Sequence, residues 1–271
     1  MKTLELANRT ISTKLPAFVM GILNATPDSF WENSRGNISS VMDLIESGAD
    51  ILDIGGESTR PGSDYINEEE EIKRIIPVIK EIRKYSDIPI SVDTRKKSVM
   101  QAAYDEGADI LNDVSALEDD DKLAFFAAQK KIPVVLMHKR GNPKLMQNQT
   151  NYDDVFKEVN DYLFERIEYA QANGIEENKI IIDPGIGFGK NLQDNVELIK
   201  NCGRLCSGNY MVLMALSRKS CIGEMTSKTV ENRLSGTLAA NLISVLNGAS
   251  IVRVHDISET IDTMKVLSYI V

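Results

Sequence analysis

The chain has 271 residues, of which 42% are hydrophobic and 26% charged, and it carries a formal net charge of −9 with a pI near 4.9. This acidic balance argues against a nucleic-acid partner, because affinity for a phosphate backbone depends on clustered lysine and arginine. No stretch approaches the roughly 18 apolar residues of a membrane span, and the N-terminus lacks a signal-peptide core. Only two histidines are present, and Cys202, Cys206 and Cys221 form no CxxC pair, so we expect a cytoplasmic protein with reduced thiols and no structural zinc.

Residues 1–13 are predicted to form a short strand pair, and eight short apolar runs follow along the chain. These runs are nearly continuous in Val, Ile, Leu and Met and do not alternate with polar residues. That pattern is typical of strands buried on both faces of a parallel sheet. The runs are Phe18–Leu23, Ile51–Ile54, Ile88–Val92, Ile110–Leu111, Val134–Met137, Ile180–Ile182, Met211–Leu216 and Ile251–Val254.

Helix-length amphipathic stretches separate the runs, and several of them carry capping signals. Acidic residues at the start suit the positive end of the helix dipole, and a glycine after the end suits a left-handed C-cap. The stretches with such signals are 39–47, 68–85, 96–106, 119–131, 153–173 and 231–247. We interpret their charge runs as solvated helix ends.

Eight strand-then-helix units without a break in composition predict a (β/α)₈ barrel over residues 1–271 as a single domain. The N-terminal strand pair is expected to close the barrel floor. The length agrees, since such barrels commonly take about 250 residues. A doubly wound open sheet is the alternative, but it would usually use about five or six strands.

Polar residues follow every one of the eight apolar runs. They are Asn24 with 26–28, Asp53 with 55–62, 93–95, Asn112 with Asp113, His138, 183–185, 217–220, and Arg253 with His255 and Asp256. One strand-end aspartate is about as often a helix cap or turn former as a functional group. Eight consecutive polar strand ends are harder to explain in that way. Barrel enzymes build their active sites at this face, so the sequence predicts an active site there.

These polar residues form two chemical groups. Hydrogen-bond acceptors come from Asp53, Asp93, Asn112 and Asp183, and cationic donors from Arg60, Lys219, Arg253 and His255. Clustered acceptors suit the N–H donors of a flat nitrogen heterocycle, whereas arginine matches phosphate oxygens. Barrels often bind phosphate after their last two strands, where Lys219, Ser220, Arg253 and His255 lie. We therefore expect one site for a heterocycle and a phosphate group.

The glycine-rich stretch 185–190 resembles a nucleotide-binding loop only loosely, because its spacing fits neither common phosphate-binding motif. We interpret it as a tight turn into a helix, with Phe188 available to contact a ring. Two long loops, 25–37 and 55–67, are rich in Gly, Pro, Ser and Asp and are predicted to be lids.

Taken together, these motifs resemble the dihydropteroate synthases, the pterin-binding (β/α)₈ enzymes of folate biosynthesis. The resemblance follows the family order across nearly the whole chain. It is carried by 20–30 (MGILNATPDSF), 53–62 (DIGGESTRPG), 91–94 (SVDT), 112–113 (ND), 136–138 (LMH), 183–190 (DPGIGFGK), 217–220 (SRKS) and 253–256 (RVHD). The most specific matches are 20–30 taken together with 53–62, and 217–220 taken together with 253–256.

The resemblance implies roles for matching residues. Asp93, Asn112, Asp183 and Lys219 resemble the pterin-binding set, and Asn24 with the pyrophosphate resembles the Mg²⁺ site. Thr59, Arg60, Arg253 and His255 resemble the pyrophosphate contacts. Phe30, Arg60, Pro61, Lys219 and Ser220 resemble the surroundings of p-aminobenzoate, where sulfonamides also bind. Asp93, Lys219 and Arg60 are the expected catalytic residues, and Asp53 is expected to organise the pterin site or a loop.

The implied reaction joins hydroxymethyl-dihydropterin pyrophosphate to p-aminobenzoate and releases pyrophosphate, with Mg²⁺ as cofactor. The resemblance also implies a homodimer with small-molecule substrates. Two alternatives stay open: a pterin-family methyltransferase acting on a corrinoid protein, and a pterin-binding paralogue without catalysis. The chain departs from the family pattern at 31–36 (WENSRG), which puts the shape of the first lid in doubt. Lys139 and Arg140, after the fifth run, are interpreted as surface residues.

Overall fold

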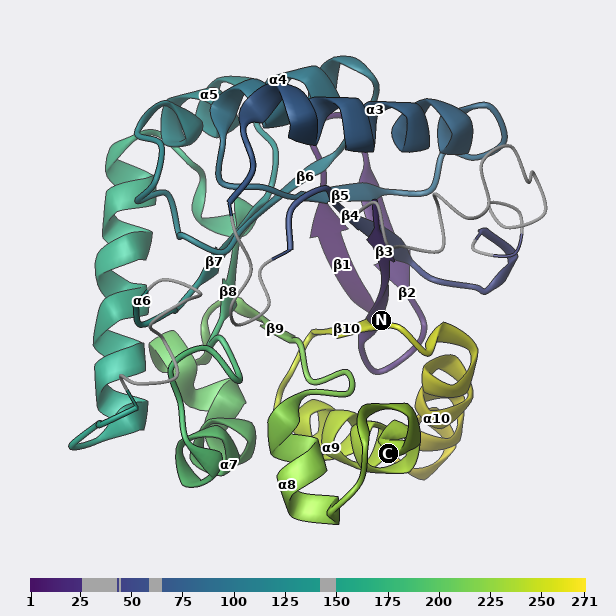
Figure 1. The fold of residues 1–271 in the computed structure, drawn as a ribbon, viewed down its shortest axis with the longest axis vertical. Coiled ribbons are helices and arrows are strands. Elements are labelled where there is room, and N and C mark those ends of the chain that lie inside the picture. The colour runs from purple at the N-terminus through teal and green to yellow at the C-terminus, as the bar shows by residue number, and fades with distance from the viewer. Residues whose placement is uncertain (26–42, 44, 59–64, 142–149) are drawn as a thin grey trace.

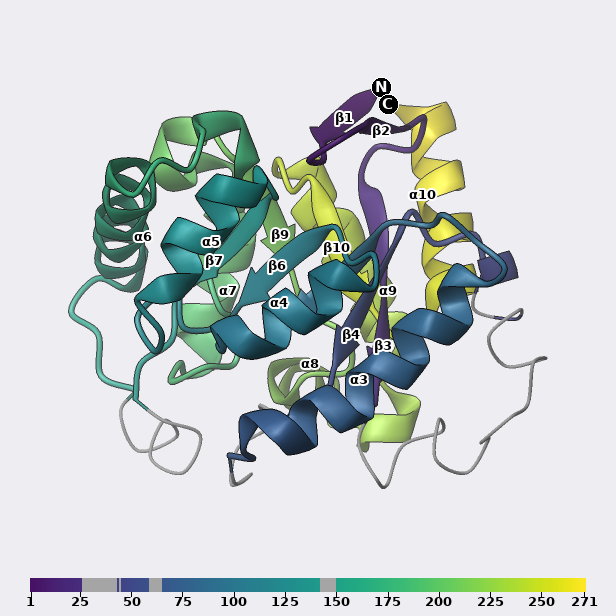
Figure 2. The same ribbon diagram turned by 90° about the horizontal axis from the view of Figure 1, so that it is seen from above.

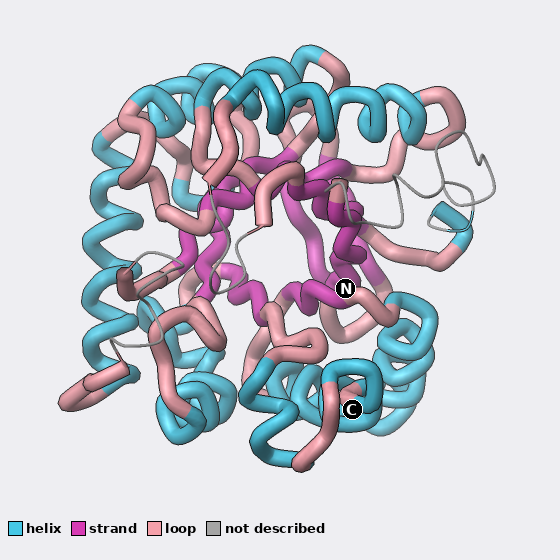
Figure 3. The backbone as a smooth tube through the Cα atoms, in the orientation of Figure 1, coloured by secondary structure: helices cyan, strands magenta, loops and turns pink. Residues whose placement is uncertain are grey.

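The computed structural model describes residues 1–25, 43, 45–58, 65–141 and 150–271. Eight parallel strands form a closed barrel in the order β10-β3-β4-β5-β6-β7-β8-β9 (Figures 1 and 3). They are β3 (Phe18–Asn24), β4 (Ile51–Gly55), β5 (Ile90–Asp93), β6 (Ile110–Asp113), β7 (Val134–Met137), β8 (Ile180–Asp183), β9 (Met211–Met214) and β10 (Ile251–Val254). Because β10 pairs with β3, with Ile251 opposite Phe18, the ring is closed. The barrel prediction is confirmed, and the open sheet is excluded.

Helices surround the barrel on its outside (Figure 2). In the described part of the chain they include α3 (Glu68–Arg83), α4 (Lys97–Asp105), α5 (Lys122–Lys130), α6 (Val155–Ala172), α7 (Leu192–Asn201), α8 (Ser220–Thr226), α9 (Leu234–Leu246) and α10 (Ile257–Ile270). Four glutamates occupy the first turn of α3, and Gly107, Gly174 and Gly248 take the positive φ expected after helix ends. These capping predictions are confirmed; most of the predicted stretch 39–47 lies outside the described residues.

The acidic run before α5 is solvated at Asp119 and Asp121, as predicted, but it also makes tertiary contacts that the sequence does not predict. The helix begins at Lys122, and its first turn contains no acidic residue. Asp119 instead accepts from the guanidinium of Arg95 at 2.9 Å, and Asp120 accepts from the backbone N–H of Lys97 at 2.8 Å. These carboxylates therefore join neighbouring strand-to-helix loops. A tertiary contact of this kind leaves no trace in the local sequence.

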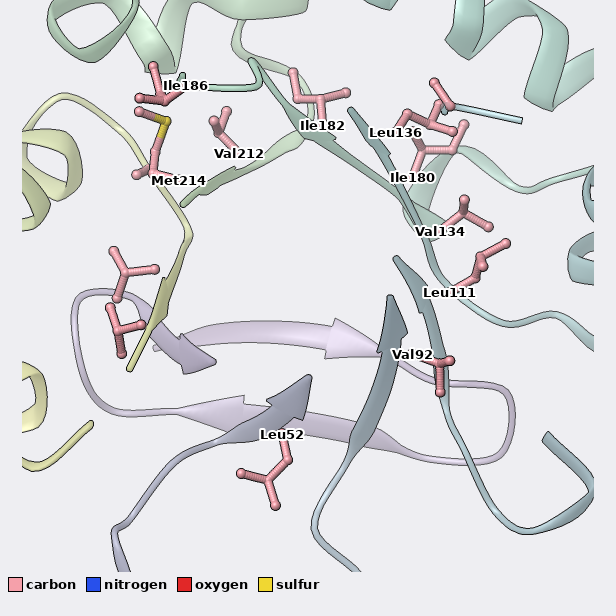
Figure 4. Close-up of a cluster of buried hydrophobic side chains, with 14 of the residues drawn as sticks. Leu52, Val92, Leu111, Val134, Leu136, Ile180, Ile182, Ile186, Val212 and Met214 are labelled. Carbon is pink, nitrogen blue, oxygen red and sulfur yellow. The ribbon is translucent and has the colours of Figure 1, made fainter. Parts of the chain in front are cut away.

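Each barrel strand buries two different faces. The outward side chains pack beneath the helices in one large apolar cluster, and Figure 4 shows several of them, including Leu52, Val92 and Ile182, pointing away from the barrel axis. The inward side chains in the lower half of the barrel form a second apolar cluster. Its members are Leu4, Leu6, Phe18, Met20, Ile51, Ile110, Val135, Ile181, Leu213, Ala215 and Ile251. Burial on both faces explains the non-alternating runs.

The antiparallel pair β1 (Lys2–Glu5) and β2 (Thr10–Thr13) closes the lower end of the barrel. Leu4 and Leu6 belong to the inward apolar cluster, so the pair is packed against the barrel interior. The ammonium of Lys179 donates to the carbonyls of Glu5 at 3.0 Å and Leu6 at 2.9 Å, which ties the pair to the start of β8. The predicted closure of the floor is confirmed.

The three cysteines are buried and none forms a disulfide. Cys202 is held by a contact from its thiol to the carbonyl of Ser244 at 3.4 Å. Among the described residues, no helix has both the length and the apolar character needed to cross a membrane.

Candidate active site

The inward face of the barrel changes from apolar to polar near the carboxyl ends of the strands. Side chains two residues apart in a strand point to the same face. A strand with one inward side chain in the lower half of the barrel therefore has a second inward side chain two residues later, nearer its carboxyl end. The inward pairs are Ile51 and Asp53, Ser91 and Asp93, Ile110 and Asn112, Ile181 and Asp183, and Ile251 and Arg253. We call the upper members of these five pairs the polar layer. It brings together residues from five strands that are far apart in the sequence.

Asp53 is the most enclosed member of the polar layer, with 0% of its surface exposed. Its carboxylate accepts from Nε of Arg253 at 2.5 Å and from Nδ2 of Asn112 at 3.2 and 3.3 Å. A buried carboxylate is costly unless it is paired and hydrogen-bonded. Arg253 and Asn112 meet that requirement for Asp53.

Asp93 shares the same guanidinium, since its Oδ2 accepts from Arg253 at 3.0 Å. Burial raises the pKa of Asp93 to about 7, while the charge of Arg253 opposes the rise and the charge of Asp53 adds to it. Arg253 is predicted from the sequence to bind an anion; in the structure its guanidinium lies among the acceptors and bridges Asp53 and Asp93.

Asp183 lies at the start of the glycine-rich turn after β8. Its Oδ1 accepts from the backbone N–H of Gly185 at 2.7 Å, and burial raises its pKa against the opposing charge of Lys219. Gly185 has a φ of +67°, and a Cβ there would lie 1.8 Å from the carbonyl oxygen of His138. Only glycine fits this position. The turn leads into α7 through a capping box of Asn191 and Asp194, so its interpretation as a structural turn is confirmed.

Lys219 reaches the site from the loop after β9. The preceding Arg218 is held by two hydrogen bonds to Asp256, at 2.6 and 2.9 Å, and has a left-handed φ of 54°. The Lys219 ammonium donates to the carbonyl of Ile186 and lies 4.8 Å from the ring centre of Phe188. Burial lowers the pKa of Lys219 to about 8, opposed by the charge of Asp183. The structure therefore brings Lys219, Phe188 and Asp183 together, as predicted.

A buried cation that the sequence argument did not assign lies beneath the same turn. Lys190 donates to Nδ1 of His138 at 2.9 Å, to the carbonyl of Gly185 at 2.9 Å and to that of Phe188 at 3.1 Å. These three acceptors match the three protons of an ammonium group. Burial lowers the pKa of Lys190 to about 7 and that of His138 to about 2. Lys190 thus holds the backbone that carries Phe188.

Three predicted residues lie higher, at the mouth of the barrel. Asn24 is exposed at the end of β3. His255 is exposed after β10, where its backbone N–H and Nδ1 contact the hydroxyl of Ser217 at 3.1 and 3.0 Å. Ser220 is exposed at the first position of α8. Asp113, by contrast, turns away from the site and accepts from the backbone N–H groups of Ser115 and Leu117, which is the capping role considered from sequence.

Several predicted residues lie outside the described part of the chain. These are Phe30, Thr59, Arg60 and Pro61, together with Trp31, residues 26–37 of the proposed lid loop 25–37 and residues 59–64 of the proposed lid loop 55–67.

Sequence reasoning missed an ion-pair network on the rim beside the polar layer. Glu57 accepts from Arg95 at 3.1 Å, from Lys96 at 2.9 Å and from the backbone N–H of Ile66 at 2.8 Å. Burial acts to raise the pKa of Glu57, but these hydrogen bonds outweigh it and hold the pKa below its usual value. The sequence signal for this network is a glutamate shortly after β4 and two basic residues shortly after β5. The network ties the end of the 55–67 loop to its beginning.

The rim also borders a hollow of about 500 Å³, lined by Tyr65, Arg95, Glu118, Asp119, Lys139 and Gly141. Its charged groups already bond to one another or to neighbours: Arg95 and Lys139 contact Asp119 at 2.9 and 3.4 Å, and Glu118 accepts from Tyr162 at 3.0 Å. The polar layer therefore remains the candidate site for a ligand. Lys139 was expected at the surface, but it is largely covered, with 15% of its side chain exposed. Arg140 packs over Tyr152 at 3.8 Å.

Comparison with known proteins identifies close relatives. The profile of the family described as pterin binding enzyme matches residues 20–255. The dihydropteroate synthase of Escherichia coli (strain K12) is 44% identical over 256 residues, which cover 92% of this chain and 90% of that protein. The Xanthomonas albilineans dihydropteroate synthase with 4-aminobenzoic acid superposes with a TM-score of 0.91 at 42% identity, covering 99% of this chain and 97% of that one. The same enzyme in complex with 7,8-dihydropteroate gives 0.88 at 40% identity, covering 99% and 98%.

Proposed function

We propose that this protein condenses hydroxymethyl-dihydropterin pyrophosphate with p-aminobenzoate. The proposal proceeds from its family: the chain belongs to the pterin binding enzymes and, within them, to the dihydropteroate synthases. The products are dihydropteroate and pyrophosphate, so the protein is a transferase. The observation that carries the proposal is the polar layer, whose buried acceptors Asp93, Asn112 and Asp183 lie on the inward face of the barrel, with Lys219 close enough for the charges of Asp183 and Asp93 to act on it. A ring edge rich in N–H donors is the chemistry that such a face recognises.

The ring-binding step uses carboxylate oxygens that accept from no described residue. One oxygen of Asp93 bonds to Arg253 and one of Asp183 bonds to Gly185, so among residues 1–25, 43, 45–58, 65–141 and 150–271 the second oxygen of each carboxylate is left for the ligand. Phe188 supplies an apolar edge beside Lys219. Burial strengthens each of these contacts, because water competes weakly there.

In the group-transfer step, the bond between the pterin methylene and the pyrophosphate oxygen breaks, and its electrons leave with pyrophosphate. Positive charge develops on the pterin methylene, and the buried carboxylates of Asp93 and Asp183 stabilise it. The amine of p-aminobenzoate then forms the new C–N bond and releases a proton. An aniline nitrogen is largely unprotonated at neutral pH, so the step needs no strong general base.

Asn24 is the residue proposed to hold Mg²⁺ together with the substrate pyrophosphate. Its side-chain oxygen is a hard ligand, and it is exposed at the barrel mouth on β3, the strand paired with β10 that precedes His255. One protein oxygen fits this ion, which usually takes few protein ligands and completes its shell with phosphates and water. Bound Mg²⁺ would neutralise charge on the leaving pyrophosphate. At the mouth, His255 and Ser220 are available to contact the pyrophosphate, while the guanidinium of Arg253 lies below them in the polar layer.

The proposal extends to a cytoplasmic homodimer. The support for the homodimer is an apolar surface on α9 and α10, two helices that lie side by side (Figure 1). The exposed apolar residues are Ile243, Leu246, Val266, Tyr269 and Ile270. Clustered exposed apolar side chains commonly mark a protein interface. Sedimentation should give twice the 30.1 kDa chain mass, and a monomer at micromolar concentration would contradict this part of the proposal.

A pyrophosphate-release assay tests the function. Release should require the pterin pyrophosphate, p-aminobenzoate and Mg²⁺ together, with dihydropteroate formed in equal amount. Pterin binding without p-aminobenzoate-dependent release would instead support a non-catalytic paralogue. Methyl transfer from methyltetrahydrofolate to a corrinoid acceptor would support the methyltransferase alternative.

A further inference from the structure

Asp53 occupies the centre of the polar layer, yet its own contacts leave it little capacity to bind a ligand. It is completely buried, and both carboxylate oxygens lie within hydrogen-bonding distance of Asn112 while one also accepts from Arg253. Its effect on a ligand must therefore pass through these two neighbours.

The carboxylate of Asp53 fixes the orientation of the Asn112 side-chain amide. An ion-paired carboxylate can only accept hydrogen bonds, so the amide must direct its NH₂ group toward Asp53. The opposite orientation would place two acceptors against each other inside the barrel. Asn112 therefore turns its carbonyl oxygen away from Asp53, and within the described part of the chain no residue donates to that oxygen.

This orientation decides the hydrogen-bonding character of the site. An amide has donors at its NH₂ end and an acceptor at its oxygen end, so its orientation decides which end faces a ligand, whereas the carboxylates of Asp93 and Asp183 offer acceptors. With the NH₂ end of Asn112 held by Asp53, its oxygen end is left for the ligand, and all three groups present oxygen. A ligand that placed a carbonyl against Asn112 would leave two acceptors unpaired in a buried position, which is costly.

We propose that Asp53 is a positioning residue that sets the ring specificity of this site, by holding Asn112 so that the polar layer accepts a ring 2-amino group and rejects a 2-oxo group. The inference rests on the proposed function only in taking the ring to be a pteridine. Asp53 acts at the level of ligand discrimination and takes no part in bond making.

The substitution Asp53→Asn tests this directly. Its oxygen would face the donating guanidinium of Arg253, which leaves its NH₂ for Asn112. The Asn112 amide must then reverse and present its NH₂ to the ligand. Calorimetry with 2-amino-4-oxopteridine and 2,4-dioxopteridine should show wild-type preference for the amino ring by at least about tenfold, and a fall in that ratio of about tenfold in the variant.

Asp113→Asn is the matched control, because Asp113 is another strand-end aspartate with 0% exposure, but among the described residues its carboxylate accepts only from Ser115 and Leu117 of its own loop. It should leave the amino-to-oxo ratio unchanged even if it lowers the melting temperature. Equal losses for both ligands in Asp53→Asn, with the ratio intact, would overturn the proposal. A wild-type ratio near one would also overturn it.

A second variant covers the case in which Asp53→Asn does not fold. Asn112→Ala should lower the ratio by itself, and an unchanged ratio there would refute the proposal. Where both variants fold, adding Asp53→Asn to Asn112→Ala should change the ratio no further, since Asp53 acts through Asn112. Wild-type protein that binds neither pteridine would contradict the proposed function instead, so the two failures are distinguishable.

Discussion

The lower and upper halves of the barrel interior are built from the same strands but carry opposite chemistry. In the lower half, Ile51, Ile110, Ile181 and Ile251 pack with the N-terminal strand pair. Two residues later, the same strands present Asp53, Asn112, Asp183 and Arg253. The apolar half stabilises the barrel through burial, whereas the polar half buries charges whose pairing at best offsets the cost of desolvation.

The side chains that stabilise the fold and those that form the candidate ligand site therefore lie on the same strands, separated by one step of two residues. Substitutions below the boundary should change stability and spare ligand binding. Substitutions above it should do the reverse.

Phe18→Ala removes the largest side chain of the apolar half, which has 0% exposure. It should lower the free energy of unfolding by about 3–5 kcal/mol, because the cavity cannot fully collapse. Urea denaturation measures this, with Phe125→Ala as control, since Phe125 is 66% exposed and should change stability by less than about 0.5 kcal/mol. A loss of pterin affinity in folded Phe18→Ala protein would break the separation.

Asp183→Ala removes one carboxylate of the polar half. It strands the ligand N–H groups that Asp183 would accept, so pterin binding should weaken by about 2–3 kcal/mol in calorimetry. The free energy of unfolding should change by less than in Phe18→Ala, because the cost of burying the carboxylate is removed and offsets part of the loss at the N–H of Gly185 and at Lys219. Unchanged pterin affinity, or a stability loss like that of Phe18→Ala, would count against the assignment.

The polar half also predicts a narrow pH profile. Asp93, with its pKa raised by burial to about 7, gains its charge as pH rises through 7. Lys219, with its pKa lowered by burial to about 8, loses its charge as pH rises through 8. If both charges are needed, kcat/KM should rise through about 7 and fall above about 8. Asp93→Asn should remove the acidic limb, and a limb that persists there would assign it to another group.

For stability, the raised pKa of Asp93 has a definite sign. The folded state binds this proton more tightly than the unfolded chain, so the contribution of Asp93 is fully present below its ordinary pKa and is lost as pH rises through about 7. Asp93→Asn should therefore flatten the dependence of unfolding free energy on pH in that window. Identical slopes for wild type and variant in urea titrations would contradict the buried position of the carboxyl.

The smallest effect is expected at the rim. Lys139→Ala removes a 3.4 Å pair with Asp119 outside the polar layer. It should cost no more than about 1 kcal/mol of stability, as partly exposed pairs do, and leave pterin affinity unchanged. A clear fall in pterin affinity would extend the ligand site beyond the barrel interior and into the neighbouring hollow.

The sequence by itself determined the barrel, because its signals are local. Continuous apolar runs mark strands buried on both faces, glycines such as Gly107 and Gly174 mark helix ends, and the polar residue after each run marks the functional face. The strand pair at the floor was likewise predictable from residues 1–13.

Only the tertiary structure decided which polar residues meet. Asp53 and Arg253 are 200 residues apart, and they pair because β10 closes against β3. Asp113 is as polar as its neighbour Asn112, but consecutive strand residues point to opposite faces, so Asp113 caps its own loop while Asn112 enters the barrel. Closure and strand register are properties of the whole ring, which is why the contacts that orient the site could not be deduced from any single segment.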